Sequence, residues 1–266
     1  MNTTQSVIIG IVEGLTEFLP ISSTAHMRIT ENFLGIANND AFSKMFSVAI
    51  QLGAILSVVV LYWKRFLQLD NKLFYVKLMI AVVPALIFGK LFSDHIDSLL
   101  EKPLVIAAIM ILGGVVFLFI ENMFKKHDID SEEKISMLTA FKIGLFQCLA
   151  ILFPGLSRSA ATIIGGMSLR LSRAAAAEFS FFLAVPTMMA ATGYKLLKYH
   201  KEQGGFQAEE IKLLAIGNIV AFVVAMIAIK FFIGFLQKHG FKIWGFYRIL
   251  VGILLLILIY SGVLQA

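Results

Sequence analysis

Residues 13–26 read EGLTEFLPISSTAH and place two carboxylates, a proline and a hydroxyl-rich turn inside an otherwise apolar segment. An ionisable group at membrane depth costs roughly 2.5–3.5 kcal/mol on insertion scales, so such groups are functional candidates by default. Pro20 removes a backbone donor and restricts the residue before it, which predicts that a helix ends there. Ser22, Ser23 and Thr24 then stand where a second helix begins, as capping residues commonly do. The stretch therefore predicts a helical hairpin with a polar turn.

A second stretch, residues 154–162, reads PGLSRSAAT and repeats this design. Its Pro-Gly pair breaks the helix, and Ser157, Arg158 and Ser159 follow at the next helix start. A helix N-terminus offers free N–H groups and a positive dipole end, which suit a phosphate. At an offset of 134 residues (144 − 10), Gly10 aligns with Gly144, Glu13 with Gln147, Leu15 with Leu149, Pro20 with Pro154, and Ser23 with Ser157. We therefore expect two copies of one hairpin.

The composition is that of a membrane protein. Of 266 residues, 59% are hydrophobic and only 15% are charged, and the mean hydropathy is +0.86. Soluble domains usually carry about a quarter charged residues. Six segments are long enough to span a bilayer, namely 46–63, 75–92, 103–120, 178–194, 213–233 and 246–263. The shorter apolar segments 5–19 with 24–36, and 139–153 with 160–171, would form hairpins that enter the membrane and return.

The predicted fold is therefore an all-α integral membrane protein. It has about six transmembrane helices plus two re-entrant helical hairpins in an inverted-topology repeat. We expect a single membrane domain over 1–266, with repeat halves of approximately 1–120 and 135–266.

The charges predict an orientation and exclude one class of partner. The loops 64–77, 121–142 and 237–248 hold eleven Lys and Arg residues, against seven in 1–45, 93–102 and 195–212. Because cytoplasmic loops favour Lys and Arg, the second set and both termini are predicted to lie outside. The net charge of +6 is scattered without a basic-aromatic groove, so no nucleic-acid partner is expected.

Glu13 and Glu17 are candidate metal ligands. Four residues apart on a helix, they share one face at about 6 Å. Two bare carboxylates there repel each other, so in apolar surroundings one takes up a proton unless a cation intervenes. Mg²⁺ or Ca²⁺ would bind carboxylate and phosphate oxygens together. The alternative is a pair of interfacial carboxylates that face water.

Ser23 and His26 are candidate catalytic residues, with Glu17. A Ser-x-x-His spacing on one helix can place a nucleophile and a base within reach. The alternative is that the hydroxyl residues only cap the helix and that His26 is a membrane-interface histidine.

Arg158 completes the predicted catalytic set, because its planar, permanently charged guanidinium fits phosphate oxygens. Thr162 lies four residues further on and shares its helical face. The predicted substrate-binding residues are the hydroxyl residues of both turns, namely Ser22, Thr24, Ser157, Ser159 and Thr162. The alternative for Arg158 is a structural ion pair with Glu13 or Glu17.

The two stretches resemble the signature motifs of the BacA/UppP family, the bacterial undecaprenyl-diphosphate phosphatases, and the resemblance extends over nearly the whole chain. It implies hydrolysis of the C55 lipid diphosphate to the monophosphate with a divalent cation, at the outer side of the cytoplasmic (inner) membrane. That step recycles the carrier for cell-wall synthesis and confers bacitracin tolerance. The functional positions carried over are Glu13, Glu17, Ser23, His26, Ser157, Arg158 and Thr162. Ala25 and Ala160 stand where the family usually has glycine.

A transporter or flippase for a polyprenyl phosphate is the alternative function, since inverted repeats are common in transporters. A third hypothesis, an ion-binding scaffold, explains the charges but not their clustering. Ser23 with His26 favours hydrolysis, because transport needs no nucleophile. The expected partners are a polyprenyl diphosphate and the lipid bilayer, and the sequence leaves a homodimer open. It also leaves open which cation binds and whether serine or water attacks phosphorus.

Overall fold

Six long apolar helical segments form the body of the protein, for which the computed structural model describes residues 1–37, 40–68, 70–92 and 102–264. Within those ranges the segments able to cross a membrane by length and composition are Ala41–Leu61 (α3, Ala41–Ala49, with α4, Gln51–Leu61), α6 (Lys72–Leu91), α8 (Pro103–Met123), α11 (Arg173–Gln203), Ala208–Leu236 of α12 (Ala208–His239), and α13 (Lys242–Tyr260). Each overlaps one of the six predicted spans. The prediction of an all-α, multi-pass membrane protein is confirmed.

The remaining structure is short. A four-residue helix, α5 (Trp63–Phe66), follows α4, and a 3₁₀ turn, η1 (Glu132–Lys134), lies between α8 and α9. The described residues hold no strand beyond an isolated bridge between Ile129 and Leu171. The segment 93–101, most of a loop predicted to lie outside, falls beyond the described residues.

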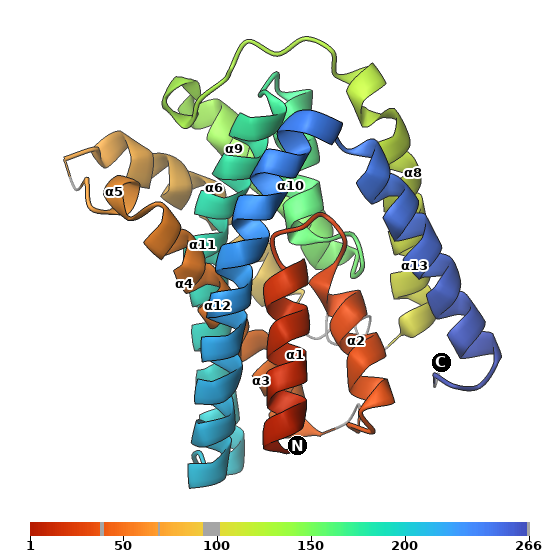
Figure 1. Ribbon diagram of the computed structural model, residues 1–266. Coiled ribbons are helices and arrows are strands. Elements are labelled where there is room, and N and C mark those ends of the chain that lie inside the picture. Colours follow the sequence, from red (N-terminus) through yellow and green to blue (C-terminus); the bar gives the residue numbers. More distant parts are fainter. Residues whose placement is uncertain (38–39, 69, 93–101, 265–266) are drawn as a thin grey trace.

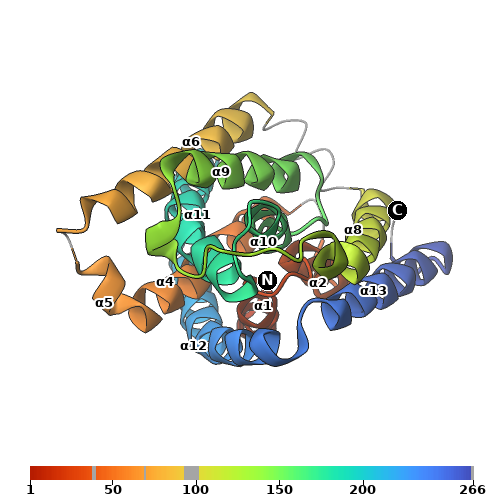
Figure 2. The ribbon, with the colours of Figure 1, turned by 90° about the horizontal axis from the view of Figure 1, so that it is seen from above.

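Four shorter helices form two hairpins, where the proline breaks predicted them. The first pairs α1 (Thr3–Thr16) with α2 (Ser23–Phe33), and the second pairs α9 (Met137–Leu152) with α10 (Arg158–Ser168). In Figure 1 the chain rises through α1 from the N-terminus and returns through α2 beside it. Seen from above, α10 lies near the centre of the bundle, surrounded by longer helices (Figure 2). Membrane depth of the turns and inverted symmetry of the halves stay predictions.

Glycines let both hairpins pack against long helices. A Cβ at Gly14 would lie 2.7 Å from the carbonyl oxygen of Ala221, near the middle of α12. A Cβ at Gly144 would clash in the same way with the backbone of Ala81, near the middle of α6. Small residues allow such backbone contact between membrane helices. The first helix of each hairpin therefore packs against the middle of a spanning helix.

Aromatic packing fixes the first turn. Phe18 is buried and meets Phe181 of α11 edge to face, with ring centroids 5.2 Å apart. Phe181 in turn packs on Phe232 of α12. Such aromatic pairs contribute about 0.5–1.5 kcal/mol beyond the area they bury. The turn thus rests on two spanning helices.

Two residues counted above as loop cations are buried within helices, and one of them is Lys77 of α6. Arg248, counted above as a loop cation, is fully buried within α13. An apolar window begun at residue 246 put it at the loop boundary, whereas α13 begins at Lys242. Nine counted cations on the predicted inner side are therefore not buried (11 − 2), against seven on the predicted outer side.

Candidate active site

Each hairpin turn ends on a strained serine. Ser22 (φ +72°) accepts a hydrogen bond from the Ala25 amide, and Ser157 (φ +74°) accepts one from the Ala160 amide. A non-glycine residue at such φ costs of order 1–3 kcal/mol and persists where its surroundings fix it. The matching caps are 135 residues apart, one more than the offset inferred from sequence. Ser22, not Ser23, is therefore the structural counterpart of Ser157.

The second turn needs its glycine. Gly155 has φ +97°, and a Cβ there would lie 2.6 Å from the carbonyl oxygen of Ile106 on α8. Both the backbone conformation and the close contact exclude a side chain. The predicted break at Pro154-Gly155 is confirmed.

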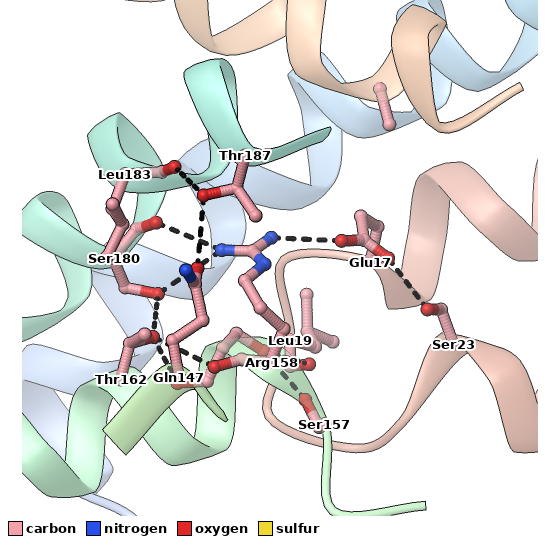
Figure 3. A network of polar contacts seen from close by, with 12 residues as sticks. Glu17, Leu19, Ser23, Gln147, Ser157, Arg158, Thr162, Ser180, Leu183 and Thr187 are labelled. Atoms are coloured by element: carbon pink, nitrogen blue, oxygen red, sulfur yellow. Dashed lines mark hydrogen bonds and ion pairs between the residues drawn. The ribbon is translucent and has the colours of Figure 1, made fainter. Parts of the chain in front are cut away.

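Glu17 joins the two sequence stretches. Its Oε1 accepts a hydrogen bond from Arg158 Nη2 at 2.9 Å, and its Oε2 accepts one from Ser23 Oγ at 2.7 Å. Figure 3 shows the carboxylate between these two side chains. Only 3% of the Glu17 side chain and 9% of the Arg158 side chain are exposed. A buried pair of this kind is strongly interdependent, since removing one partner leaves the other charge uncompensated.

Arg158 is held on its other side by α11. Its Nη1 donates to the carbonyl oxygen of Ser180 at 3.0 Å (Figure 3). The Ser180 hydroxyl lies 2.7 Å from Thr162 Oγ1, which also donates to the Arg158 carbonyl oxygen. Thr162 is buried, so it supports the arginine from behind rather than lining an open surface. Ser180 was not predicted as a site residue.

The hydroxyl residues of the turns differ in availability. Ser159 is buried and donates to the Leu19 carbonyl oxygen at 3.0 Å, which links the two turns, and its hydroxyl lies 2.9 Å from that of Ser157. Ser22 is also buried, whereas Thr24 and Ser157 are partly exposed. Of the five predicted substrate-binding residues, Thr24 and Ser157 are the ones a ligand can reach directly.

His26 turns away from Ser23. Its Nδ1 lies 2.7 Å from the Ser22 carbonyl oxygen and must donate there, because a carbonyl only accepts. Its Nε2 lies 2.8 Å from the hydroxyl of Tyr247 on α13. Ser23 donates to Glu17 instead. The expectation that His26 accepts the Ser23 proton does not match this geometry, because the backbone bond to Ser22 orients the ring toward α13.

Glu13 has the features of a cation ligand. Its side chain is fully buried, and neither carboxylate oxygen has a hydrogen-bond partner within the described structure. A buried polar group without a partner is costly, and hard cations bind such oxygens. Among the described residues, no three or more His, Cys, Asp or Glu side chains lie together in a group that could hold a metal ion by themselves. Glu13 and Glu17 thus fit a cation whose other ligands are substrate oxygens or water.

A cavity of about 440 Å³ opens beside the start of α2. Its lining includes Thr24 and Gln51 together with the charged side chains of Arg28, Glu31 and Lys198. Thr24 follows Ser23 directly, so the cavity offers a polar approach to the first turn.

The model of the family described as bacitracin resistance protein BacA matches residues 6–254. The chain belongs to the BacA family. An undecaprenyl-diphosphatase of Flavobacterium psychrophilum is 55% identical over 97% of this chain and 96% of its own. The undecaprenyl-diphosphatase of Porphyromonas gingivalis strain W83 is 52% identical over 99% of each chain, and that of Enterococcus faecalis is 46% identical over 95% of each.

The BacA family match covers both hairpins and all of the site residues described above. It includes Ser180 and Tyr247, which lie outside the two quoted stretches.

Proposed function

We propose that this BacA family member is an undecaprenyl-diphosphatase. It hydrolyses undecaprenyl diphosphate to undecaprenyl phosphate and phosphate, which recycles the lipid carrier for cell-wall synthesis and confers bacitracin tolerance. The observation that carries the proposal is the double contact of Glu17, to Ser23 at 2.7 Å and to Arg158 at 2.9 Å. This double contact brings together the proposed nucleophile (the Ser23 hydroxyl), a proton acceptor (the Glu17 carboxylate) and a guanidinium suited to phosphate (Arg158) in one buried cluster.

The geometry suits direct attack by Ser23. Its oxygen forms a bond to the terminal phosphorus as its proton passes to Glu17. The bond between that phosphorus and the bridging oxygen breaks, and polyprenyl monophosphate leaves. Arg158 stabilises the charge on the transferred phosphoryl group. Water then cleaves the phosphoserine, which releases phosphate and restores Ser23.

The two acidic residues of α1 would hold the cation. Mg²⁺ or Ca²⁺ bound by Glu13 and Glu17 would neutralise diphosphate charge. Support comes from the buried Glu13 oxygens that lack donors. Glu17 also keeps its contacts to Arg158 and Ser23, so it would serve both halves of the site.

The proposed location is the bacterial inner membrane, with the cavity open to the periplasmic side. The cavity near Thr24 lies at the end of the bundle that carries the N-terminus and the connection between α11 and α12. The Lys and Arg count supports the proposal that this end lies outside.

The transporter alternative is separable by experiment. The protein purified in detergent is given undecaprenyl diphosphate, and the lipid product and free phosphate are identified by mass spectrometry and a phosphate assay. We expect equal amounts of undecaprenyl phosphate and phosphate. Recovery of intact lipid diphosphate, together with its movement across reconstituted vesicles, would instead establish transport.

A further inference from the structure

A buried arginine outside both motif stretches contacts both hairpin turns. Arg248 lies on α13 and is fully buried. Its Nη1 donates to the Pro20 carbonyl oxygen at 3.1 Å, and its Nη2 donates to the Gly155 carbonyl oxygen at 2.9 Å. One guanidinium therefore ties the first turn to the second, across 228 residues of sequence in one case and 93 in the other.

This arrangement is costly by itself. Burying a cation costs several kcal/mol unless it is well paired. In the described part of the chain Arg248 has no carboxylate partner, and its Nε donates to nothing. A neutral side chain of similar size would fill the space without the free-energy cost of burying a charge. The cost of burying the charge is offset by two hydrogen bonds, to turn carbonyls that accept no bond within a helix. These two bonds hold both turns in place at once.

The space for the guanidinium is built by α8. A Cβ at Gly113 would lie 2.5 Å from Arg248 Nη2 and 3.2 Å from its Cζ. The Phe117 ring lies 5.9 Å from the same Cζ. An alanine at position 113 would therefore displace the guanidinium while it leaves the arginine in the chain.

The residue before Arg248 holds His26. The Tyr247 hydroxyl lies 2.8 Å from His26 Nε2, and the two rings are nearly parallel, at 4°, with centroids 5.7 Å apart. Because Nδ1 donates to the Ser22 carbonyl, the neutral ring has its free lone pair on Nε2, where the tyrosine donates. Both ring nitrogens are thus fixed.

We propose that Tyr247 and Arg248 are positioning residues of the proposed hydrolysis: Arg248 sets the spacing of the two turns, and Tyr247, through His26 and its bond to the Ser22 carbonyl, fixes the start of α2, which carries Ser23. Glu17 and Ser23 come from the first hairpin and Arg158 from the second, so their spacing depends on how the turns are held. A displacement of about 1 Å can cost on the order of 10²-fold in rate. The inference rests on the proposed function.

The test uses two pairs of variants. Gly113→Ala displaces the Arg248 guanidinium, and Gly193→Ala is its control, since a Cβ at Gly193 meets nothing within 4 Å. Tyr247→Phe removes only the hydroxyl, and its control is Tyr260→Phe, a tyrosine of the same helix that is 81% exposed. Phosphate release from undecaprenyl diphosphate is measured with the thermal midpoint of each purified protein.

We expect Gly113→Ala and Tyr247→Phe to lower the kcat of the folded protein by roughly ten- to a hundred-fold, with KM close to wild type. Tyr247→Phe should keep the wild-type thermal midpoint, whereas Gly113→Ala should lower the midpoint but stay folded at the assay temperature. Both controls should match wild type. A normal kcat in either test variant overturns the role of the residue it probes, as does a loss that only follows a fall in folded protein or a rise in KM. No phosphate release by wild type would instead contradict the proposed function.

Discussion

Glu17 and Arg158 lie 141 residues apart in sequence, yet their side chains are joined by a 2.9 Å ion pair in the interior of the bundle. The pair connects the two hairpin turns at the point where Ser23 also bonds to Glu17. Four predictions concern this centre and one concerns the orientation of the chain.

Glu17→Gln should lower turnover by about 10²–10⁴-fold, the range for loss of a general base. The amide no longer accepts the Ser23 proton and leaves Arg158 without its counter-charge. Phosphate release by purified protein measures this, with Glu133→Gln as the control because Glu133 is an exposed partner of Arg65. Equal rates in both variants would remove Glu17 from the chemistry.

Arg158→Lys should not restore activity. A lysine has no planar fork, so it cannot reach both Glu17 and the Ser180 carbonyl oxygen as Arg158 does. We expect a loss of roughly 10²–10³-fold in kcat. Arg170→Lys is the matched control, since Arg170 forms an exposed pair with Asp128. A wild-type rate in the Arg158 variant would show that a point charge suffices.

Glu13→Gln should weaken cation binding. In the wild-type protein Mg²⁺ or Ca²⁺ should raise the thermal midpoint, because a ligand at about 100 times its Kd stabilises by roughly 2.7 kcal/mol. The variant should lose most of that increase and should need more cation for half-maximal turnover, whereas Glu209→Gln should not. EDTA should abolish wild-type activity. An unchanged cation response in Glu13→Gln would contradict the assignment.

The orientation can be tested by labelling in whole cells. The connection between α8 and α9 and the one between α11 and α12 lie at opposite ends of the bundle (Figure 1). In a Cys148→Ala background, Glu209→Cys should react with a membrane-impermeant thiol reagent and Asp130→Cys should not. Both side chains are exposed in the structure. The opposite labelling pattern would place the cavity on the cytoplasmic side.

Much of the fold could be predicted because its signals are local. Pro20 and Pro154 end helices by removing a donor, and uninterrupted apolar runs mark the spans. The ion pair between Glu17 and Arg158 could also be anticipated, since a structural ion pair of Arg158 with Glu13 or Glu17 was one of the alternatives that the sequence left open. Local chemistry thus gave the hairpins and most of the central cluster.

The supporting residues could not be predicted in the same way. Ser180 and Tyr247 lie in long apolar helices, where a single hydroxyl gives little signal. Arg248 was assigned to a loop because the start of α13 was placed four residues too late. The orientation of His26 depends on a backbone carbonyl and on a tyrosine 221 residues away. Such contacts depend on how distant helices pack, and the pattern of neighbouring residues in the sequence does not specify that packing.

Phosphate release from undecaprenyl diphosphate by wild type and by Ser23→Ala, purified side by side, tests the central claim most directly. Ser57→Ala is the control, because Ser57 is a buried serine whose hydroxyl donates to the Ala54 carbonyl oxygen of its own helix. We predict steady release by wild type and by the control, and a loss of at least about 10²-fold in Ser23→Ala at an unchanged thermal midpoint. Turnover in Ser23→Ala within a few-fold of wild type would contradict attack by Ser23.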